Sequence, residues 1–255
     1  MRAALKHRAK AFLTKRLGEA APVAQPSPPK GLLFEVDEFY QRTYQRGLQV
    51  TNTPDNPKRR ERHYNLMQFF QQTIPLPDGL MAECGCWNGL SSFVMCNYVR
   101  ARQPNFTGAG YHIFDSFEGL SEPTAKDALP AQTIANLQAA FGTVAGGFRA
   151  RLEDVRAALS DFPEITFHPG WLPASLEGLP EARYKFVHID VDLYEPTLGA
   201  VAYFYPRLVP GGLIICDDYG SLQFPGARRA FDEYCSTHNL PLLTISTAQA
   251  VLWKR

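Results

Sequence analysis

The sequence has 255 residues, of which 26 are basic and 25 acidic, so its formal net charge is +1. This balance excludes the broad positive surface that attracts nucleic acid, and no nucleic-acid partner is expected. No stretch is apolar over the length of a transmembrane helix, and no secretory leader is recognised. The five cysteines are an odd number in apolar or glycine-rich segments, which indicates free thiols and a cytoplasmic protein.

The first 30 residues are expected to form a basic tail followed by a proline-rich linker. Residues 1–18 are basic, which is compatible with a solvated tail or with an amphipathic helix that binds a membrane surface or a partner. Residues 19–30 contain four prolines, a composition typical of an extended linker. We therefore expect residues 1–30 to lie outside the folded core.

The next segment, residues 31–79, is expected to be a helical cap over the mouth of the site that also shapes the acceptor pocket. Helices are predicted at 38–45 and 59–72, with Pro54 and Pro57 breaking the chain between them. Its aromatic side chains would either contact a substrate or belong to the core. They are Phe34, Phe39, Tyr40, Tyr44, Phe69 and Phe70.

From residue 80 onward, predicted strands alternate with predicted helices. The strands cover 80–84, 110–114, 165–168, 184–189, 213–216, 242–246 and 250–253, and the helices cover 91–102, 131–141, 151–159, 197–208 and 226–238. This pattern predicts an α/β fold with a mostly parallel, Rossmann-like, seven-stranded sheet. Only three residues separate the last two strands, which must therefore form an antiparallel hairpin. The arrangement is typical of class I S-adenosylmethionine (SAM) methyltransferases, so residues 80–255 are predicted to be the SAM-binding domain.

A glycine-rich segment from Gly85 to Gly89 follows the first of these strands and precedes a helix. Glycines let the backbone pass close to a ligand, and the start of a helix offers free N–H groups. The Gly-x-x-x-Gly spacing departs from the three-glycine pattern that suits a pyrophosphate. A plain turn between strand and helix remains the alternative. Cys84 and Cys86 are not expected to bind a metal together, because alternate strand positions face opposite ways.

Asp115 ends the second strand of this domain. A carboxylate at this place can accept both ribose hydroxyls of an adenosine, because ligands bind at the carboxyl ends of the strands in open α/β sheets. The alternative is that Asp115 caps the turn that follows it. The presence of Asp115 alone does not distinguish an NAD-binding protein from a SAM-binding protein.

Four aspartates follow two further strands that are expected to be neighbours. Asp190 and Asp192 come after one strand, and Asp217 and Asp218 after the next. Carboxylates meeting at adjacent strand ends would repel each other unless a cation joined them, and such ligands suit Mg²⁺. The alternative is that they cap helices or pair with Arg228 and Arg229. We expect His188, within the strand, to belong to the core or to support the site rather than bind the metal.

Several motifs occur together between residues 80 and 235. They are Gly85-Cys86-Trp87-Asn88-Gly89, Phe114-Asp115-Ser116-Phe117-Glu118-Gly119-Leu120, His188-Ile189-Asp190-Val191-Asp192-Leu193-Tyr194-Glu195-Pro196-Thr197, Cys216-Asp217-Asp218-Tyr219-Gly220 and Phe224-Pro225-Gly226-Ala227. With them the sequence resembles the macrocin O-methyltransferase family, which methylates sugar hydroxyls of macrolide antibiotics. The resemblance implies SAM and Mg²⁺ as cofactors and a small-molecule glycoside as acceptor.

A more distant resemblance is to the catechol O-methyltransferases, and it implies Asp190, Asp217 and Asp218 as the metal ligands. Those enzymes carry a lysine base where this sequence has Leu193, which makes a phenolic acceptor less certain. The residues expected to contact SAM are Glu83, Gly85, Trp87, Gly89, Ser91, Asp115, Ser116, Gly170, Trp171 and Asp190.

The expected reaction is metal-assisted methylation of a sugar hydroxyl on a natural product or a polysaccharide. Asp190 is the first candidate for the proton acceptor, and Asp192 is the second. The alternatives are a catechol-type O-methyltransferase, an NAD-binding oxidoreductase and a non-catalytic binding module with the SAM fold. The sequence is also compatible with a homo-oligomer.

Overall fold

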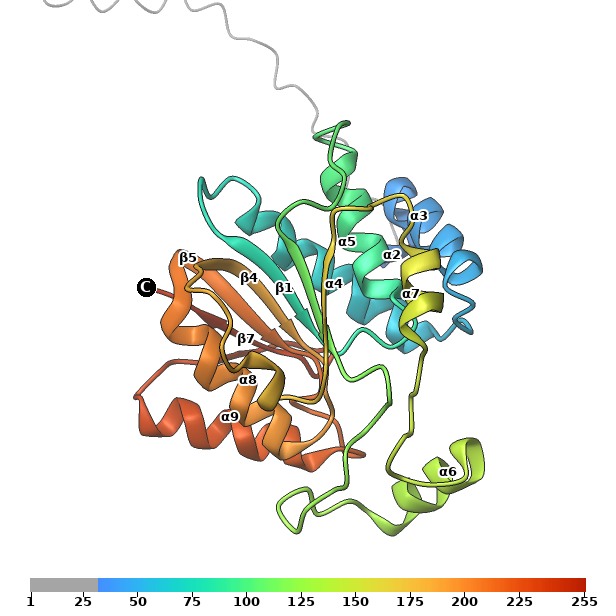
Figure 1. Ribbon diagram of the computed structural model, residues 1–255, viewed down its shortest axis with the longest axis vertical. Coiled ribbons are helices and arrows are strands. Elements are labelled where there is room, and N and C mark those ends of the chain that lie inside the picture. The colour runs from blue at the N-terminus through green and yellow to red at the C-terminus, as the bar shows by residue number, and fades with distance from the viewer. Residues whose placement is uncertain (1–31) are drawn as a thin grey trace, which may run out of the picture.

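The computed structural model describes residues 32–255 as a three-layer α/β fold around one sheet (Figure 1). The predicted tail and linker, residues 1–30, lie outside the described residues. The sheet has seven strands in the order β3-β2-β1-β4-β5-β7-β6. They are β1 Leu80–Cys84, β2 Tyr111–Asp115, β3 Thr166–Pro169, β4 Tyr184–Ile189, β5 Leu208–Cys216, β6 Leu243–Thr244 and β7 Ala250–Trp253.

The first five strands run parallel, and β7 runs antiparallel to both β5 and β6. The predicted α/β fold with a closing antiparallel hairpin is therefore confirmed. Because β1 lies between β2 and β4, the order of the strands reverses there. In such sheets, ligands bind outside the carboxyl ends of the strands at this reversal.

Helices cover both faces of the sheet. One face carries α3, α4, α5 and α7, and the other carries α8 and α9, while α6 stands apart from both layers (Figure 1). The helices are α2 Leu33–Val36, α3 Glu38–Val50, α4 Pro57–Thr73, α5 Leu90–Arg100, α6 Ala131–Phe141, α7 Leu152–Ala158, α8 Tyr194–Arg207 and α9 Pro225–Thr237, with a short 3₁₀ turn at Ala174–Leu176.

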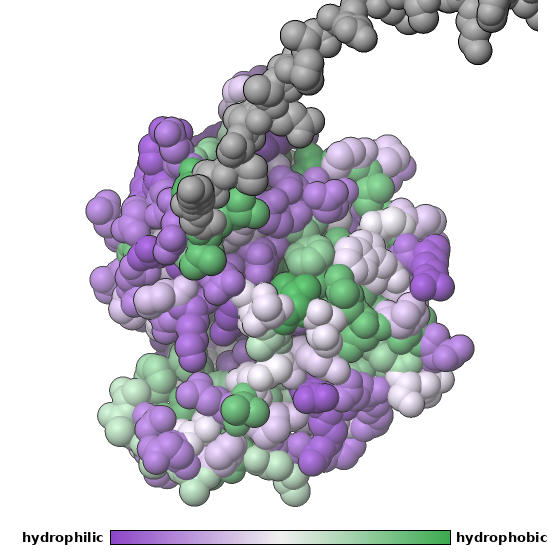
Figure 2. Space-filling model, turned by 180° about the vertical axis from the view of Figure 1, so that it is seen from behind, coloured by the Kyte–Doolittle hydropathy of each residue, from purple (hydrophilic) through white to green (hydrophobic). Residues whose placement is uncertain are grey.

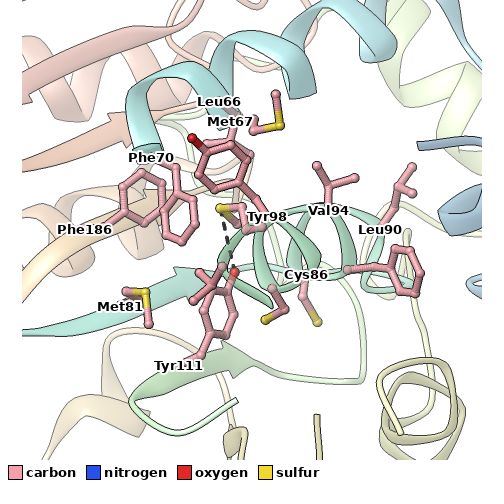
Figure 3. Close-up of a cluster of buried hydrophobic side chains, with 14 of the residues drawn as sticks. Leu66, Met67, Phe70, Met81, Cys86, Leu90, Val94, Tyr98, Tyr111 and Phe186 are labelled. Atoms are coloured by element: carbon pink, nitrogen blue, oxygen red, sulfur yellow. Dashed lines mark hydrogen bonds between the residues drawn. The ribbon is translucent and has the colours of Figure 1, made fainter. Parts of the chain in front are cut away.

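The two cores follow from the alternation of side chains along each strand. In β4, Phe186 faces the layer of α3, α4 and α5, whereas Val187 faces α8 and α9. Phe70 of α4 meets Phe186 edge-on with 4.8 Å between the ring centroids (Figure 3). The same alternation turns Glu83 and His188 toward α4 and α5, and this orientation determines what those two polar residues can reach.

The start of β5 differs from the prediction. The strand begins at Leu208 rather than at Leu213, because Leu208 pairs with Tyr184 before the register shifts. The intervening Gly211 donates its N–H to the Lys254 carbonyl at 2.9 Å. The proline and glycine segment, whose composition predicts the end of a helix, therefore lies inside a bulged strand. At the other end of the sheet, β6 is shorter than predicted.

The helices of residues 32–79 pack into the core instead of lying wholly above it. Asp37 caps α3 by accepting the Tyr40 N–H at 2.9 Å, and Asn56 caps α4 with Pro57 in its first turn. Tyr40 and Tyr44 are completely buried. Only the first half of α4 reaches the carboxyl edge of the sheet.

On the face shown in Figure 2, hydrophilic residues are interspersed with smaller hydrophobic areas. Among residues 32–255, no helix combines the length and the apolarity that crossing a membrane requires.

Candidate active site

A cavity of about 330 Å³ opens at the carboxyl ends of the strands. The loops after β1, β2, β3, β4 and β5 all contribute to its wall, together with the first half of α4. The predicted site residues that line it are Gly85, Trp87, Asp115, Ser116, Gly170, Trp171, Asp190, Asp192 and Asp218.

The loop after β1 passes unusually close to the loop after β4. Gly85 has φ +80°, and a Cβ built there would overlap with the carbonyl oxygen of Asp190. Glycine is therefore required at Gly85 for the contact between two loops, in addition to any role toward a ligand. Trp87, also at positive φ, lies under the Arg59 guanidinium, which is 5.2 Å from its ring centroid.

Asp115 ties the loop after β1 to the turn after β2. Its Oδ2 accepts the Cys86 N–H at 2.7 Å and the Trp87 N–H at 3.3 Å, and its Oδ1 accepts the Phe117 N–H at 2.7 Å. Burial raises the pKa of Asp115, and these backbone donors oppose the rise. The turn cap considered from the sequence is therefore present. The carboxylate nevertheless stays in the cavity wall.

The loops after β2 and β3 form another part of the wall. The Ser116 hydroxyl donates to the Gly119 carbonyl at 2.8 Å, and the Trp171 indole N–H donates to the same oxygen at 3.2 Å. Trp171 remains 45% exposed, so its ring is accessible at the rim of the cavity. Gly170, at φ +139°, lets the chain turn between β3 and this tryptophan.

Three of the predicted cofactor residues lie outside the cavity wall. Glu83 is fully buried and faces away from the cavity, where it accepts hydrogen bonds from Ser92 and Tyr111. Gly89 begins α5 at φ +86° and approaches α7. Ser91 is buried within α5.

Asp190, Asp192 and Asp218 meet in the cavity. Asp192 has φ +60°, a left-handed conformation that is uncommon outside glycine, and its N–H donates to Asp218 Oδ2 at 3.2 Å. Burial, together with the Asp190 carboxylate, raises the pKa of Asp192 to about 8. Burial and the carboxylates of Asp192 and Asp190 also raise the pKa of Asp218 well above its ordinary value.

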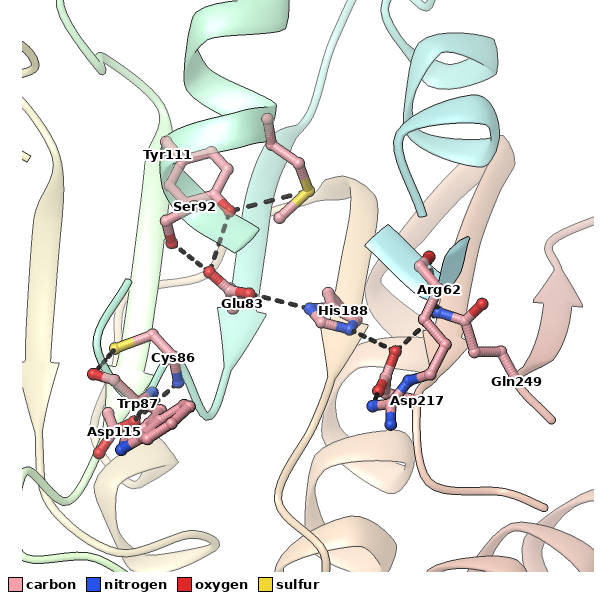
Figure 4. Close-up of polar contacts among 11 residues, drawn as sticks. Arg62, Glu83, Cys86, Trp87, Ser92, Tyr111, Asp115, His188, Asp217 and Gln249 are labelled. Atoms are coloured by element: carbon pink, nitrogen blue, oxygen red, sulfur yellow. Dashed lines mark hydrogen bonds and ion pairs between the residues drawn. The ribbon is translucent and has the colours of Figure 1, made fainter. Parts of the chain in front are cut away.

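Asp217 is buried beside this group but does not line the cavity. Its Oδ1 accepts a hydrogen bond from Gln249 Nε2 at 2.6 Å and lies 3.4 Å from His188 Nε2, and its carboxylate forms an ion pair with Arg62 (Figure 4). The oxygen of this carboxylate that meets Arg62 Nη2 is Oδ2. The pairing with Arg228 considered from the sequence is not formed, because that arginine pairs with Asp232.

These acids fit a hard cation. His188, Asp190 and Asp217 each offer a ligand atom within 4.8 Å of the others. Two nearby carboxylates have raised pKa values, and Asp217 Oδ2 is paired with the Arg62 guanidinium. A cation would relieve the repulsion among the carboxylates and compete with Arg62 for that oxygen.

The prediction placed residues 31–79 over the mouth of the site, but it did not single out the basic residues of α4 that line the cavity. Arg59, Arg62 and His63 line the cavity, although the helix lies more than a hundred residues before the acid cluster. His63 is buried, and its Nδ1 has no hydrogen-bond partner among the described residues. The basic run of residues 58–63 was the available signal. None of the six aromatic residues singled out in residues 31–79 lines this cavity.

The model of the macrocin O-methyltransferase (TylF) family matches residues 59–255, which include the cavity wall just described. The chain belongs to this family. It is therefore a SAM-dependent O-methyltransferase.

A tetracenomycin 4'-O-methyltransferase of Streptomyces olivaceus, named for a dimethoxy-rhamnosyl substrate, is 35% identical over 74% of this chain and 71% of its own length. The mycinamicin III 3''-O-methyltransferase of Micromonospora griseorubida is 28% identical over 69% of this chain and 68% of its own length.

Solved structures of methyltransferases share the fold. The O-methyltransferase NovP superposes with a TM-score of 0.61 at 25% identity, covering 76% of this chain and 79% of its own. The calicheamicin methyltransferase CalS11 superposes with a TM-score of 0.62 at 17% identity, covering 89% of this chain and 98% of its own. Both agree with the class I SAM methyltransferase fold of the family.

Proposed function

We propose that this methyltransferase transfers the methyl group of SAM to a sugar hydroxyl of a glycosylated small molecule with the help of Mg²⁺. The names of the two relatives, a rhamnosyl-tetracenomycin enzyme and a mycinamicin enzyme, support a glycoside acceptor. A catechol acceptor is less favoured, because the position of the lysine base in those enzymes is occupied by the buried Leu193. A sugar of a surface polysaccharide remains a second candidate acceptor.

SAM is proposed to lie along the loops after β1, β2 and β3. Gly85 and Trp87 would pass beside its methionine part, and Asp115 would face the ribose from the end of β2. Ser116 and Trp171, which also line the cavity, are proposed to lie beside the adenine. Residues 80–255 would thus hold the donor. Within residues 31–79, α4 would face the acceptor with Arg59 and His63.

Asp190, Asp217 and Asp218 are the residues proposed to hold Mg²⁺. When bound there, the ion would lower the pKa of an acceptor hydroxyl and help to orient it. The chain's own contribution is alignment, since a methyl transfer needs the acceptor oxygen, the methyl carbon and the sulfur in line. Asp218 is held by the Asp192 N–H, and Asp217 by Gln249, so both side chains have fixed orientations.

The proton of the hydroxyl is proposed to pass to Asp190 or Asp192. Asp192 is the stronger candidate, because it lines the cavity and is not needed as a metal ligand. Its raised pKa means that its ionised form is a stronger base than an ordinary carboxylate, and a bound cation would favour that ionised form. Asp190 would then act mainly as a ligand beside Gly85.

One observation carries this proposal: the glycine loop with Asp115 and the aspartate cluster line the same cavity. The test is a panel of glycosides and catechols incubated with labelled SAM, with and without Mg²⁺. Label transferred to a sugar hydroxyl only in the presence of the ion supports the proposal. Transfer to catechols alone would redirect it to the catechol-type reaction.

We also propose that the enzyme works in the cytoplasm and binds no nucleic acid. All five cysteines are buried free thiols, as expected in a reducing compartment. The balanced charge of the sequence supports the second point. Detection of the enzyme in fractionated cells and a gel-shift assay would test the two statements.

A further inference from the structure

His188 is a completely buried polar residue in the layer between the sheet and helices α4 and α5. Both of its ring nitrogens face carboxylates. Nδ1 lies 2.9 Å from Glu83 Oε1, and Nε2 lies 3.4 Å from Asp217 Oδ1 (Figure 4). Burial of three such groups is costly unless they satisfy one another, so the arrangement needs a physical reason.

The strand register produces this row of side chains. Glu83 of β1 pairs directly with His188 of β4, which in turn pairs with Ile215 of β5. Asp217 follows Ile215 by two residues and therefore keeps the same face. The row crosses three neighbouring strands, from the strand that leads into the glycine loop to the strand that leads into the aspartate pair.

Both ends of the row are fixed. At one end, Glu83 accepts hydrogen bonds from the hydroxyls of Ser92 and Tyr111. At the other, Asp217 accepts one from Gln249 at 2.6 Å. The imidazole between them has no freedom to turn, because each nitrogen has a partner. The other oxygen of Asp217, Oδ2, meets the Arg62 guanidinium.

We propose that His188, backed by Glu83, is a positioning residue that orients Asp217 so that its Oδ2, which pairs with Arg62, can bind the cation in place of the guanidinium. This inference rests on the cation site proposed above. His188 itself is not assigned as a ligand, because both of its ring nitrogens already face carboxylates. Hydrogen-bond partners of metal ligands typically contribute 10- to 100-fold in metal affinity.

Two substitutions test the contacts of the two ring nitrogens separately. The amide of His188→Gln places an N–H where Nε2 stands and keeps the donor toward Asp217. The amide of His188→Asn mimics Nδ1 and keeps only the contact with Glu83. We expect His188→Asn to weaken Mg²⁺ and Mn²⁺ binding about 10- to 100-fold by calorimetry, and His188→Gln to stay within about three-fold of the wild type.

The kinetics of the two variants should differ in the same way as their cation affinities. The concentration of Mg²⁺ that gives half-maximal turnover should rise in His188→Asn, while kcat at saturating Mg²⁺ and the Kd for SAM change little. Equal cation affinity in His188→Asn and the wild type would overturn the inference. A wild-type protein that binds neither Mg²⁺ nor Mn²⁺ would instead overturn the proposed cation site, so the two failures are distinguishable.

A second pair of measurements tests the role of His188 if His188→Asn does not fold. Glu83→Gln keeps the shape of its side chain but loosens the imidazole, and it should weaken Mn²⁺ binding at least three-fold. Pulsed EPR of Mn²⁺ bound to the wild-type protein should show no directly coordinated imidazole nitrogen. Unchanged Mn²⁺ binding in Glu83→Gln, or a coordinated His188 nitrogen in the spectrum, would overturn the inference.

Discussion

Arg62 of α4 forms an ion pair with the Asp217 carboxylate at the end of β5. The Asp217 side chain is 1% exposed, and that of Arg62 is 32% exposed, so the pair is largely shielded from water. Arg62 also opposes the rise in the pKa values of Asp192 and Asp218. A helix distant in sequence thus supplies the positive charge nearest to the proposed cation ligands.

Arg62→Gln should strengthen cation binding and lower the stability of the cation-free protein. The guanidinium competes with a cation for Asp217, so its removal should increase Mg²⁺ affinity about ten-fold by calorimetry. Without the cation, an unpaired buried carboxylate should cost about 2 kcal/mol of unfolding free energy. Arg42→Gln is the control, because its partner Glu38 and Arg42 itself are both exposed. Weaker Mg²⁺ binding in Arg62→Gln would contradict this account of the ion pair.

Gly85→Ala should disrupt the contact between the loops after β1 and β4. Its Cβ would overlap with the Asp190 carbonyl, so we expect a loss of about 3 kcal/mol or more in unfolding free energy, and loss of SAM binding. Gly142→Ala is a matched control, because Gly142 has the same φ of +80° but nothing within 4 Å of the added atom. The control should lose only about 1 kcal/mol. Equal losses in denaturant unfolding would refute the steric explanation.

Asp115→Ala should weaken both the fold and the cofactor site. Three backbone N–H groups, of Cys86, Trp87 and Phe117, would lose their acceptor. We expect about 1–3 kcal/mol less unfolding free energy and a similar loss in SAM binding, measured by thermal unfolding and calorimetry. The exposed Glu118, changed to Gln, serves as the control. Unchanged SAM affinity in Asp115→Ala would leave this residue with the turn-capping role alone.

His112 should make the protein less stable as the pH falls below neutrality. Burial, with a smaller effect of the neighbouring His168, lowers its pKa from 6.5 to about 4. The folded state therefore keeps His112 neutral while the unfolded chain binds a proton, so stability is lost as the pH falls from 6.5 toward 4. We expect about 1–2 kcal/mol, reduced by solvent screening of this half-buried group. His112→Asn should show a smaller fall between pH 7 and pH 5, and identical profiles would disprove the assignment.

Much of the fold was predictable because each parallel strand is followed by, or ends at, a glycine or an acid, and because β1, β2 and β4 are short, largely buried segments. Asp115, Asp190 and Asp218 reach one cavity because the carboxyl ends of neighbouring strands meet there. The start of β5 was not predictable, since its pairing with Tyr184 depends on a bulge rather than on local pattern. The partner of Asp217 was not predictable either, because the position of α4 is set by core contacts such as that of Phe70 with Phe186.

The surroundings of the Glu83 side chain could not be predicted from the local sequence either. The resemblance to catechol O-methyltransferases implied a cofactor contact for Glu83, but the strand alternation turns its side chain into the layer beneath α5. The register that brings Glu83 beside His188 involves residues 105 positions apart. Local sequence does not encode that pairing.

The effect of EDTA on turnover and on SAM binding, measured on the same samples, tests most directly whether a cation held by Asp190, Asp217 and Asp218 assists methyl transfer. The acceptor is the glycoside that takes up label in the screen described above. Removing the cation should abolish turnover, and added Mg²⁺ should restore it. The Kd for SAM should change by less than about three-fold, because its proposed contacts come mainly from other loops. Full turnover in EDTA would contradict the account.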